Sequence, residues 1–173
     1  MSYDVTEAID RTSSLAVDKT ISLRAAHVSE AKEISLLSRQ HVEYGLRWRW
    51  TPTRIRSCIR DAETMVLVAS RSGVIEGFAI MKFGDNTAHL LLLAVQPKAR
   101  RSGIGSSLVH WLEKSCVTAG ILHVRLEMRA ANHAAKLFYR HLGYRRLGQV
   151  AAYYDRREAA IVMGRMLNER VSG

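Results

Sequence analysis

Residues 88–106 read AHLLLLAVQPKARRSGIGS, and this stretch decides the fold. Residues 88–95 are apolar almost throughout, which predicts a strand buried on both faces at the centre of a sheet. Residues 103–119 then carry Ile104, Leu108 and Leu112 at helical spacing, so we expect an amphipathic helix. A basic, glycine-containing loop that leads from a strand into a helix favours an anion site, because helix N-termini present unpaired N–H groups and a positive dipole end.

The loop differs from two common nucleotide-binding loops. A P-loop needs G-x-x-x-x-G-K-S/T, which is absent. A dinucleotide-binding fingerprint needs a third glycine, where Leu108 stands, and a first glycine directly after the strand, where residues 96–102 intervene. Two glycines by themselves favour an ordinary strand-to-helix turn. However, Gly103 and Gly105 would let the backbone approach a phosphate closely, and basic residues precede them.

The remaining chain supplies further strands and helices. Strands are predicted at 20–24, 65–69, 74–83 and 122–128, with a closing hairpin of 144–151 and 158–166. Helices are predicted at 29–40 with Ser29 as N-cap, at 51–60 with Thr51 and Pro52 as N-cap and N1, and from Asn132 to just before Gly143. The predicted order is β-α-α-β-β-β-α-β-α-β-β. Residues 1–19 are predicted to be an N-terminal arm and residues 20–173 a single domain.

The composition is that of a globular protein, with 47% hydrophobic and 24% charged residues among 173. We see no signal peptide and no apolar run that would span a membrane, so we expect a cytoplasmic protein. Cys58 and Cys116 form no C-x-x-C pair, which favours reduced thiols over a disulfide or a metal site. The net charge of +10 would attract nucleic acid, a ribosomal surface or a phosphorylated cofactor, with local concentrations at 98–101 and 145–146.

Two motifs make the chain resemble the GNAT superfamily of N-acetyltransferases. Arg100-x-x-Gly103-x-Gly105 matches the acetyl-CoA loop of that superfamily. Residues 132–144, NHAAKLFYRHLGY, match its N-x-x-A-x-x-F-Y-x-x-x-G-F signature with Tyr144 in place of Phe. The resemblance implies an α/β (α+β) GNAT fold: a mixed, mostly antiparallel twisted sheet of about seven strands, flanked by about four helices, whose central parallel strands splay apart.

Within the superfamily, the chain is most similar to bacterial ribosomal-protein-alanine N-acetyltransferases. The similarity lies in residues 126–132, LEMRAAN, and in Tyr153 and Tyr154 followed by residues 158–163. Ala159 departs from the acidic residue usual in those enzymes, and the region around Trp48 and Trp50 matches them poorly.

The resemblance also implies acetyl-CoA as cosubstrate, with no metal. Its pantetheine arm would pair with the end of the central strand, at Leu93, Ala94 and Val95. The diphosphate would lie on a loop made of Arg100, Arg101, Ser102, Gly103, Ile104, Gly105 and Ser106. Asn132 would serve as a helix N-cap, as a coenzyme contact, or as both.

Acetyl transfer to an amine requires a base for the amine and an acid for the leaving thiolate. The resemblance assigns the base to Glu127, acting through water, and the acid to Tyr139. By pattern alone, Glu127 would be an ordinary cross-strand glutamate and Tyr139 a core aromatic. His89, on the central strand, is a rival base, although a lone histidine in an apolar strand is more often hydrogen-bonded core.

The implied acceptor is a primary amine, first of all the N-terminal α-amine of a protein, with a ribosomal protein and the ribosome as the partners suggested by the resemblance. A second enzymatic interpretation is a GNAT enzyme that acetylates a small-molecule amine. Two non-enzymatic interpretations remain: a basic nucleic-acid-binding module and an acetyl-CoA sensor. No membrane partner is expected, and the chain would be a monomer or a homodimer.

Overall fold

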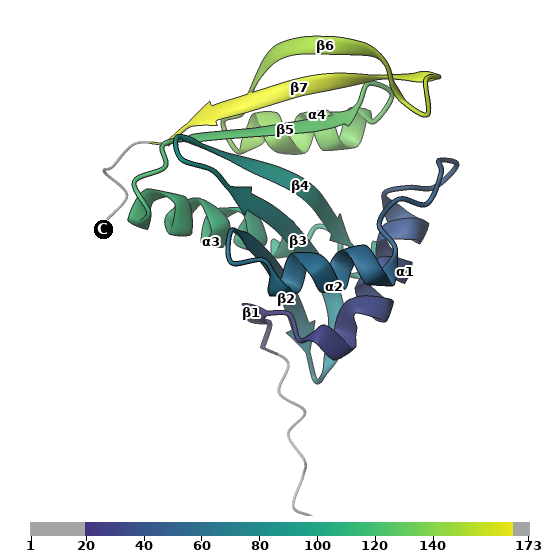
Figure 1. The fold of residues 1–173 in the computed structure, drawn as a ribbon, viewed down its shortest axis with the longest axis vertical. Coiled ribbons are helices and arrows are strands. Elements are labelled where there is room, and N and C mark those ends of the chain that lie inside the picture. Colours follow the sequence, from purple (N-terminus) through teal and green to yellow (C-terminus); the bar gives the residue numbers. More distant parts are fainter. Residues whose placement is uncertain (1–19, 168–173) are drawn as a thin grey trace, which may run out of the picture.

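The computed structural model describes residues 20–167, so the predicted arm of residues 1–19 lies outside the described residues. Its strands form one seven-stranded sheet in the order β1-β2-β3-β4-β5-β7-β6 (Figure 1). The strands are β1 (Ser22–Ala25), β2 (Thr64–Arg71), β3 (Val74–Phe83), β4 (Thr87–Val95), β5 (His123–Arg129), β6 (Arg145–Tyr154) and β7 (Glu158–Met166). The helices are α1 (Ala31–His41), α2 (Pro52–Arg60), α3 (Ile104–Thr118) and α4 (His133–His141), with 3-10 turns η1 (Val28–Glu30) and η2 (Pro97–Ala99). The predicted element order and fold class are confirmed.

Two hydrophobic cores lie on opposite faces of this sheet. Alternate residues of β2 point to opposite faces, as in any strand. Val66 and Val68 join Ile34 of α1 and Ile55 of α2 in one buried cluster. Leu67 and Ala69 join the other cluster, which includes Leu108 and Leu112 of α3 and Tyr139 of α4. Helices α1 and α2 therefore cover one face, and α3 and α4 cover the other.

The sheet opens at its centre. Strands β4 and β5 are its parallel pair, and they pair only from Thr87–His123 to Leu90–Leu126. Beyond these residues no ladder joins them, and Figure 1 shows β4 diverging from β5. Every other neighbouring pair is antiparallel. The predicted splay of the central parallel strands is confirmed.

The prediction that residues 88–95 are buried on both faces is confirmed only in part, because Ala88 and Leu90 join one core and Leu92 and Ala94 the other, but burial is not continuous. Burial alternates along β4, and His89, Leu91, Leu93 and Val95 are each only partly buried. The strand also contains a β-bulge, because the register passes from Ile80–Leu92 directly to Met81–Leu90 and leaves Leu91 as the extra residue. His89 lies within the ladder with β5, opposite Arg125, whereas Leu91, Leu93 and Val95 lie beyond its end.

Helix ends follow local capping rules with one exception. Thr51 caps α2 by accepting a hydrogen bond from the Arg54 N–H at 3.4 Å, as predicted. The predicted N-cap at Ser29 is wrong, because the segment starts with a 3-10 turn whose N-cap is His27. Glu30 stabilises this turn instead: its carboxylate accepts from the His27 N–H at 2.7 Å and pairs with Arg24 at 2.6 Å.

Three further expectations from the sequence concern the cysteines, metal binding and membrane-spanning helices. Cys58 and Cys116 are free thiols, and burial raises the pKa of Cys116 to about 12. Residues 20–167 hold no group of three or more His, Cys, Asp or Glu side chains that could bind a metal ion. No helix in the same range is long and apolar enough to cross a membrane.

Candidate active site

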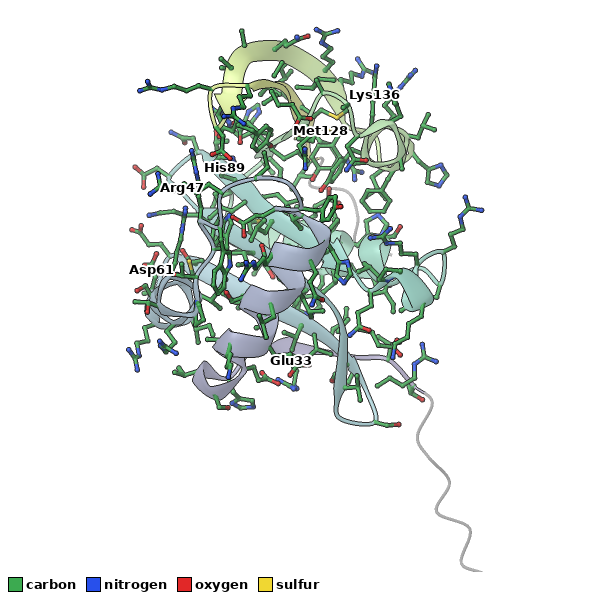
Figure 2. The ribbon with its side chains drawn as sticks, turned by 90° about the vertical axis from the view of Figure 1, so that its right-hand side faces the viewer. Glu33, Arg47, Asp61, His89, Met128 and Lys136 are labelled. Atoms are coloured by element: carbon green, nitrogen blue, oxygen red, sulfur yellow. The ribbon has the colours of Figure 1, made fainter. Side chains whose placement is uncertain are left out.

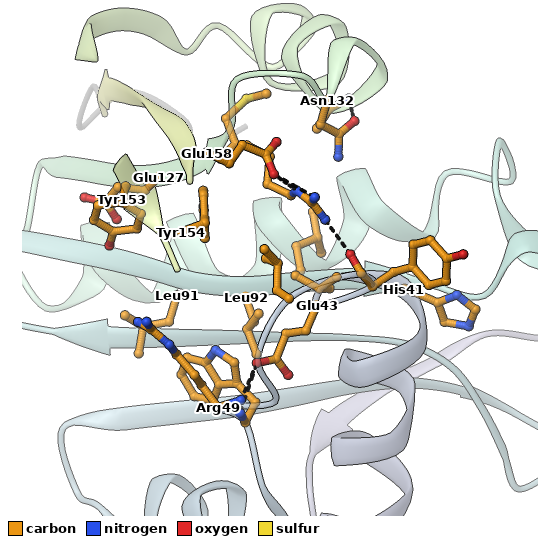
Figure 3. Close-up of a pocket in the computed structure, with 18 of the residues that line it drawn as sticks. His41, Glu43, Arg49, Leu91, Leu92, Glu127, Asn132, Tyr153, Tyr154 and Glu158 are labelled. Carbon is orange, nitrogen blue, oxygen red and sulfur yellow. Dashed lines mark hydrogen bonds and ion pairs between the residues drawn. The ribbon is translucent and has the colours of Figure 1, made fainter. Parts of the chain in front are cut away.

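A cavity of about 620 Å³ lies where β4 and β5 diverge (Figure 3). Its walls come from the loop between α1 and α2, from β4 and β5, from the start of α4 and from the turn between β6 and β7. The predicted catalytic residues Glu127 and Tyr139 line it, together with the rival base His89 and with Asn132. Segments far apart in the sequence therefore meet at the one place where the sheet is open.

His89 and Glu127 are direct partners. In the parallel register His89 of β4 lies opposite Arg125 of β5, and Glu127 follows Arg125 on the same face of the strand. The His89 Nε2 and Glu127 Oε2 atoms contact each other, and Arg125 Nη2 donates to Glu127 Oε1 at 2.6 Å. The Glu127 side chain is only 9% exposed, whereas the His89 side chain, labelled in Figure 2, is 33% exposed. The two candidate bases thus form one pair.

The contacts of Glu127 shift the pKa of its carboxyl group. The hydrogen bond from His89 lowers the pKa of Glu127, and Arg125 lowers it further, against the opposing effect of burial. A carboxylate with a lowered pKa is a weaker base but a better holder of nearby positive charge. An imidazole, in contrast, can accept a proton on one ring nitrogen while it donates from the other.

Tyr139 of α4 approaches the same cavity from the other side. It is 8% exposed and packs edge-on against Phe138 and Tyr144, with ring centroids 5.1 and 5.6 Å away. Burial, reinforced by the neighbouring Tyr154, raises the pKa of the Tyr139 phenol well above its ordinary value. The phenol therefore stays protonated and can act as a proton donor.

A buried carboxylate holds the loop between α1 and α2. Glu43 accepts hydrogen bonds from the N–H groups of Arg49 and Trp50 at 2.6 and 3.2 Å, and from the Ser38 hydroxyl at 3.1 Å. The Arg49 bond is drawn in Figure 3. The backbone N–H of Arg47 in this loop donates to Asp155 at 2.6 Å, which ties the loop to the turn after β6. One cavity wall is thereby fixed in place.

Arg129 fixes a second wall. Its guanidinium pairs with Glu158 of β7 at 2.7 and 2.8 Å and donates to the backbone carbonyl of Tyr44 at 2.7 Å (Figure 3). Sequence reasoning missed Glu43, Arg129 and Glu158 as site-forming residues. Arg129 and Tyr44 are separated by 85 positions, and no local sequence pattern predicts a contact over that distance.

The predicted diphosphate loop lies at the end of β4, before α3. Gly103 is the N-cap of α3 with φ +83°, in the left-handed region that glycine adopts without strain. The first bond of the helix runs from the Ser107 N–H to the Gly103 carbonyl at 2.9 Å. The N–H groups of Ile104, Gly105 and Ser106 are therefore free of helical partners and form the anion-attracting end of the helix.

The structure gives several loop residues more specific positions. Gly105 packs against α4, since a Cβ there would lie 3.2 Å from the Phe138 ring. The Ser102 hydroxyl donates to the Ala99 carbonyl at 2.6 Å, and Arg100 Nε donates to the Val95 carbonyl at 3.1 Å. Arg101 adopts a left-handed φ of +61°.

The end of β4 presents backbone groups to the opening. The Gln96 N–H bonds the Glu76 carbonyl at 2.8 Å, so alternation in the antiparallel ladder pairs Ala94 with β3 and turns the N–H and C=O groups of Leu93 and Val95 toward the gap. Of the three residues predicted to contact the pantetheine arm, the backbones of Leu93 and Val95 face the opening, and that of Ala94 does not. Asn132 caps α4 by accepting from the Ala135 N–H at 3.0 Å, which leaves its amide NH₂ free to donate.

Comparison with known proteins decides the family. The model described as the acetyltransferase (GNAT) family matches residues 28–144. The chain belongs to the GNAT acetyltransferase family. The resemblance deduced from the two sequence motifs is confirmed.

Over 97 residues, this GNAT chain is 33% identical to an uncharacterized N-acetyltransferase of Methanocaldococcus jannaschii, covering 56% of the chain and 62% of that protein. It is 34% identical over 97 residues to the [ribosomal protein bS18]-alanine N-acetyltransferase of Escherichia coli, covering 54% of the chain and 66% of that enzyme. The matches thus span slightly less than two thirds of these relatives. The crystal structure of Ard1 from Thermoplasma volcanium superposes with a TM-score of 0.77 at 25% identity, covering 86% of this chain and 99% of that one.

Proposed function

We propose that the protein is an acetyl-CoA-dependent N-acetyltransferase that acts on a primary amine, first of all the N-terminal α-amine of a protein. One observation carries the proposal. The ladder between β4 and β5 ends at Leu90 and Leu126, and a His–Glu pair, a protonated tyrosine and free backbone groups gather in the opening. Acetyl-CoA would supply an activated acetyl thioester there.

The residues that would hold the coenzyme fit its chemistry. The free amides of residues 104–106 and the charges of Arg100 and Arg101 suit a diphosphate. The outward backbone groups of Leu93 and the Val95 N–H suit an arm with amide groups, which would bond along the strand edge, whereas the Val95 carbonyl already accepts from Arg100 Nε. A backbone N–H in that row would also stabilise negative charge on the acetyl oxygen.

The His89–Glu127 pair would make the amine nucleophilic. An α-amine titrates near pH 8 and a lysine amine near 10.4, so an ammonium must lose a proton before attack. We assign proton acceptance to the His89 imidazole, directly or through one water, and assign Glu127 to holding the resulting imidazolium. This differs from the sequence hypothesis, which ranked Glu127 first as the base and His89 as its rival. The lowered pKa of Glu127 supports the division of roles.

Tyr139 would donate its proton to the departing sulfur. Its phenol stays protonated because burial raises its pKa, and it lies in the wall of the cavity that holds the base pair. The base would then act from strands β4 and β5, and the acid would act from helix α4.

An α-amine is favoured as acceptor for two reasons. Its lower pKa demands less of the base than the pKa of lysine does, and the E. coli relative is named as an N-acetyltransferase of an alanine of ribosomal protein bS18. Such an acceptor would place the enzyme in the cytoplasm, close to the ribosome. A small-molecule amine is the second candidate, because a cavity of about 620 Å³ falls within the usual size range of small-ligand sites.

Turnover with a designed acceptor panel tests the proposal. Free-thiol release from acetyl-CoA is measured with Ala-starting peptides, with Nα-acetylated lysine peptides of the same sequence and with small amines. We expect the free α-amine peptides to react fastest. A preference for lysine or for a small amine would refute the acceptor. No thiol release with any amine, together with no heat on titration with CoA, would refute the enzyme itself.

A further inference from the structure

A second cavity, of about 310 Å³, lies between α4 and the β6–β7 hairpin. Lys136 and Arg140 of α4 and Arg145 and Arg146 of β6 line it, together with Tyr144, Ile161 and Met163. Lys136 is labelled in Figure 2. Helix α4 separates the two cavities, because its residues Ala135 and Tyr139 and its N-cap Asn132 line the first one. This second cavity is called the basic cleft below.

The basic cleft has no compensating negative charge. No carboxylate lines it, and residues 128–154 contain four arginines and one lysine but no Asp or Glu. Some arginines elsewhere in residues 20–167 pair with carboxylates, as Arg24 does with Glu30 and Arg165 with Glu113. Within that range no ion pair joins any of the four cleft cations to a carboxylate.

Like charges lie close together around the basic cleft, which favours an anionic ligand. Lys136 and Arg140 are spaced i, i+4 on α4, where like charges repel. Arg145 and Arg146 are adjacent in β6, and a β-bulge follows immediately, with Leu147 as the extra residue between the Arg146–Met163 and Gly148–Val162 pairs. Lys136, Arg140, Arg145 and Arg146 all line this one concave surface, which focuses a positive potential.

We propose that the basic cleft binds the phosphate backbone of RNA. Three of its four cations are arginines, whose planar guanidinium groups match phosphate oxygens in bidentate fashion. Four cations spread over two elements exceed what a single phosphate needs and suit successive phosphates of one strand. RNA binding does not require the acetylation proposed above, and only the preference for RNA over DNA rests on a ribosomal acceptor.

Fluorescence anisotropy with a labelled RNA hairpin tests the proposal at several salt concentrations. The cleft variant is R145Q/R146Q, the charge-retaining variant is R145K/R146K, and the matched control is R56Q/R60Q on α2, which removes the same charge elsewhere. Melting temperatures and CoA binding establish that each variant is folded. A DNA duplex and vesicles of phosphatidylcholine with phosphatidylserine are measured in parallel.

We expect the cleft variant to lose RNA affinity and salt dependence together. Each lost phosphate contact lowers the steepness of log K against log salt by about 0.9. Between about 50 and about 200 mM salt, the RNA affinity of the wild type should therefore fall by a factor roughly 12 times larger than the affinity of a variant that has lost two contacts. The α2 control keeps most of the wild-type affinity, and the lysine variant, which keeps the charges but loses the bidentate geometry, lies between the wild type and the cleft variant.

Four results would overturn the proposal: no saturable RNA binding by the wild type, equal losses in the cleft variant and the α2 control, tighter binding of DNA than of RNA, or a cleft variant that loses vesicle binding while keeping RNA. Because RNA binding is measured without acetyl-CoA, failure of the proposed enzyme activity would be seen separately.

Discussion

The contact between His89 and Glu127 yields a prediction in which the two residues act as one unit. The perturbations are H89Q, E127Q and the double variant, with kcat/KM measured on the best amine. A general base contributes about 10²–10⁴-fold, so we expect each single variant to lose at least about 100-fold, equivalent to about 2.7 kcal/mol of transition-state stabilisation.

The double variant distinguishes a unit from two independent groups. Groups that act together lose their joint contribution once, so the double variant should fall no more than a few-fold below the worse single variant. Independent groups would instead lose the product of both factors. CoA binding measured by calorimetry is the control, and it should stay unchanged in all three variants, since neither side chain belongs to the diphosphate loop.

The ionisation state of Glu127 in the H89Q variant bears on the same assignment of roles. The hydrogen bond from His89 lowers the pKa of Glu127, so H89Q should let that pKa rise toward its ordinary value of about 4.3. Glu127 would still be ionised at neutral pH, and the activity lost in H89Q could not be attributed to its protonation. If H89Q keeps activity within about threefold of wild type while E127Q loses 100-fold, Glu127 alone is the base and our assignment is refuted.

The lowered pKa of Glu127 also links stability to pH. A carboxyl group with a lowered folded-state pKa contributes stability that is complete above its unfolded pKa of about 4.3 and is lost as the pH falls through the folded value. The difference in melting temperature between wild type and E127Q should therefore be largest near neutral pH and shrink in acid. A difference that stays constant down to about pH 3 would contradict the pKa shift.

Three further substitutions test other parts of the site and its support. Y139F should lower kcat about 10²–10⁴-fold and leave CoA affinity unchanged, and a variant with normal kcat would remove Tyr139 as the acid. G103A should cost about 1 kcal/mol, or about 2–4 °C in melting temperature, because φ is +83° while a Cβ there would meet nothing within 4 Å. E113L should lower the free energy of unfolding in urea by about 2–3 kcal/mol, because Arg165 and the Tyr144 hydroxyl both lose their carboxylate partner. The expected loss is smaller than for a fully buried ion pair, since the Arg165 side chain is 29% exposed. Unchanged stability in E113L would show that the cluster of these three residues is not a stabilising one.

The diphosphate loop shows where local sequence is a reliable guide. The apolar run, the glycines and the helical spacing after residue 103 all act within a few residues, and the structure places the loop between β4 and α3 as expected. The caps at Thr51 and Asn132 are local in the same sense, because each side chain bonds an N–H three positions ahead. Ser29 fails for a tertiary reason: the carboxylate of Glu30, which also pairs with Arg24 of β1, organises that turn instead.

The apolar run at 88–95 shows the limit of such reasoning. Periodicity indicates burial but does not reveal a bulge at Leu91, because the bulge depends on the register with β3. The sequence also offered His89 and Glu127 as rivals for one role. Only the parallel register of β4 with β5, 38 positions further on, makes them partners.

The sequence by itself determined the element order, the helix caps at Thr51 and Asn132, the glycine loop and the superfamily, since these depend on neighbouring residues and on short motifs. Tertiary structure alone decided that the predicted splay of the central strands begins after Leu90, that Glu43 and Arg129 hold the cavity walls, and that the cations of α4 and β6 share one cleft. The physical reason is that these features arise from strand register and long-range packing. A shift of one residue in register would turn His89 and Glu127 to opposite faces of the sheet without changing any local pattern.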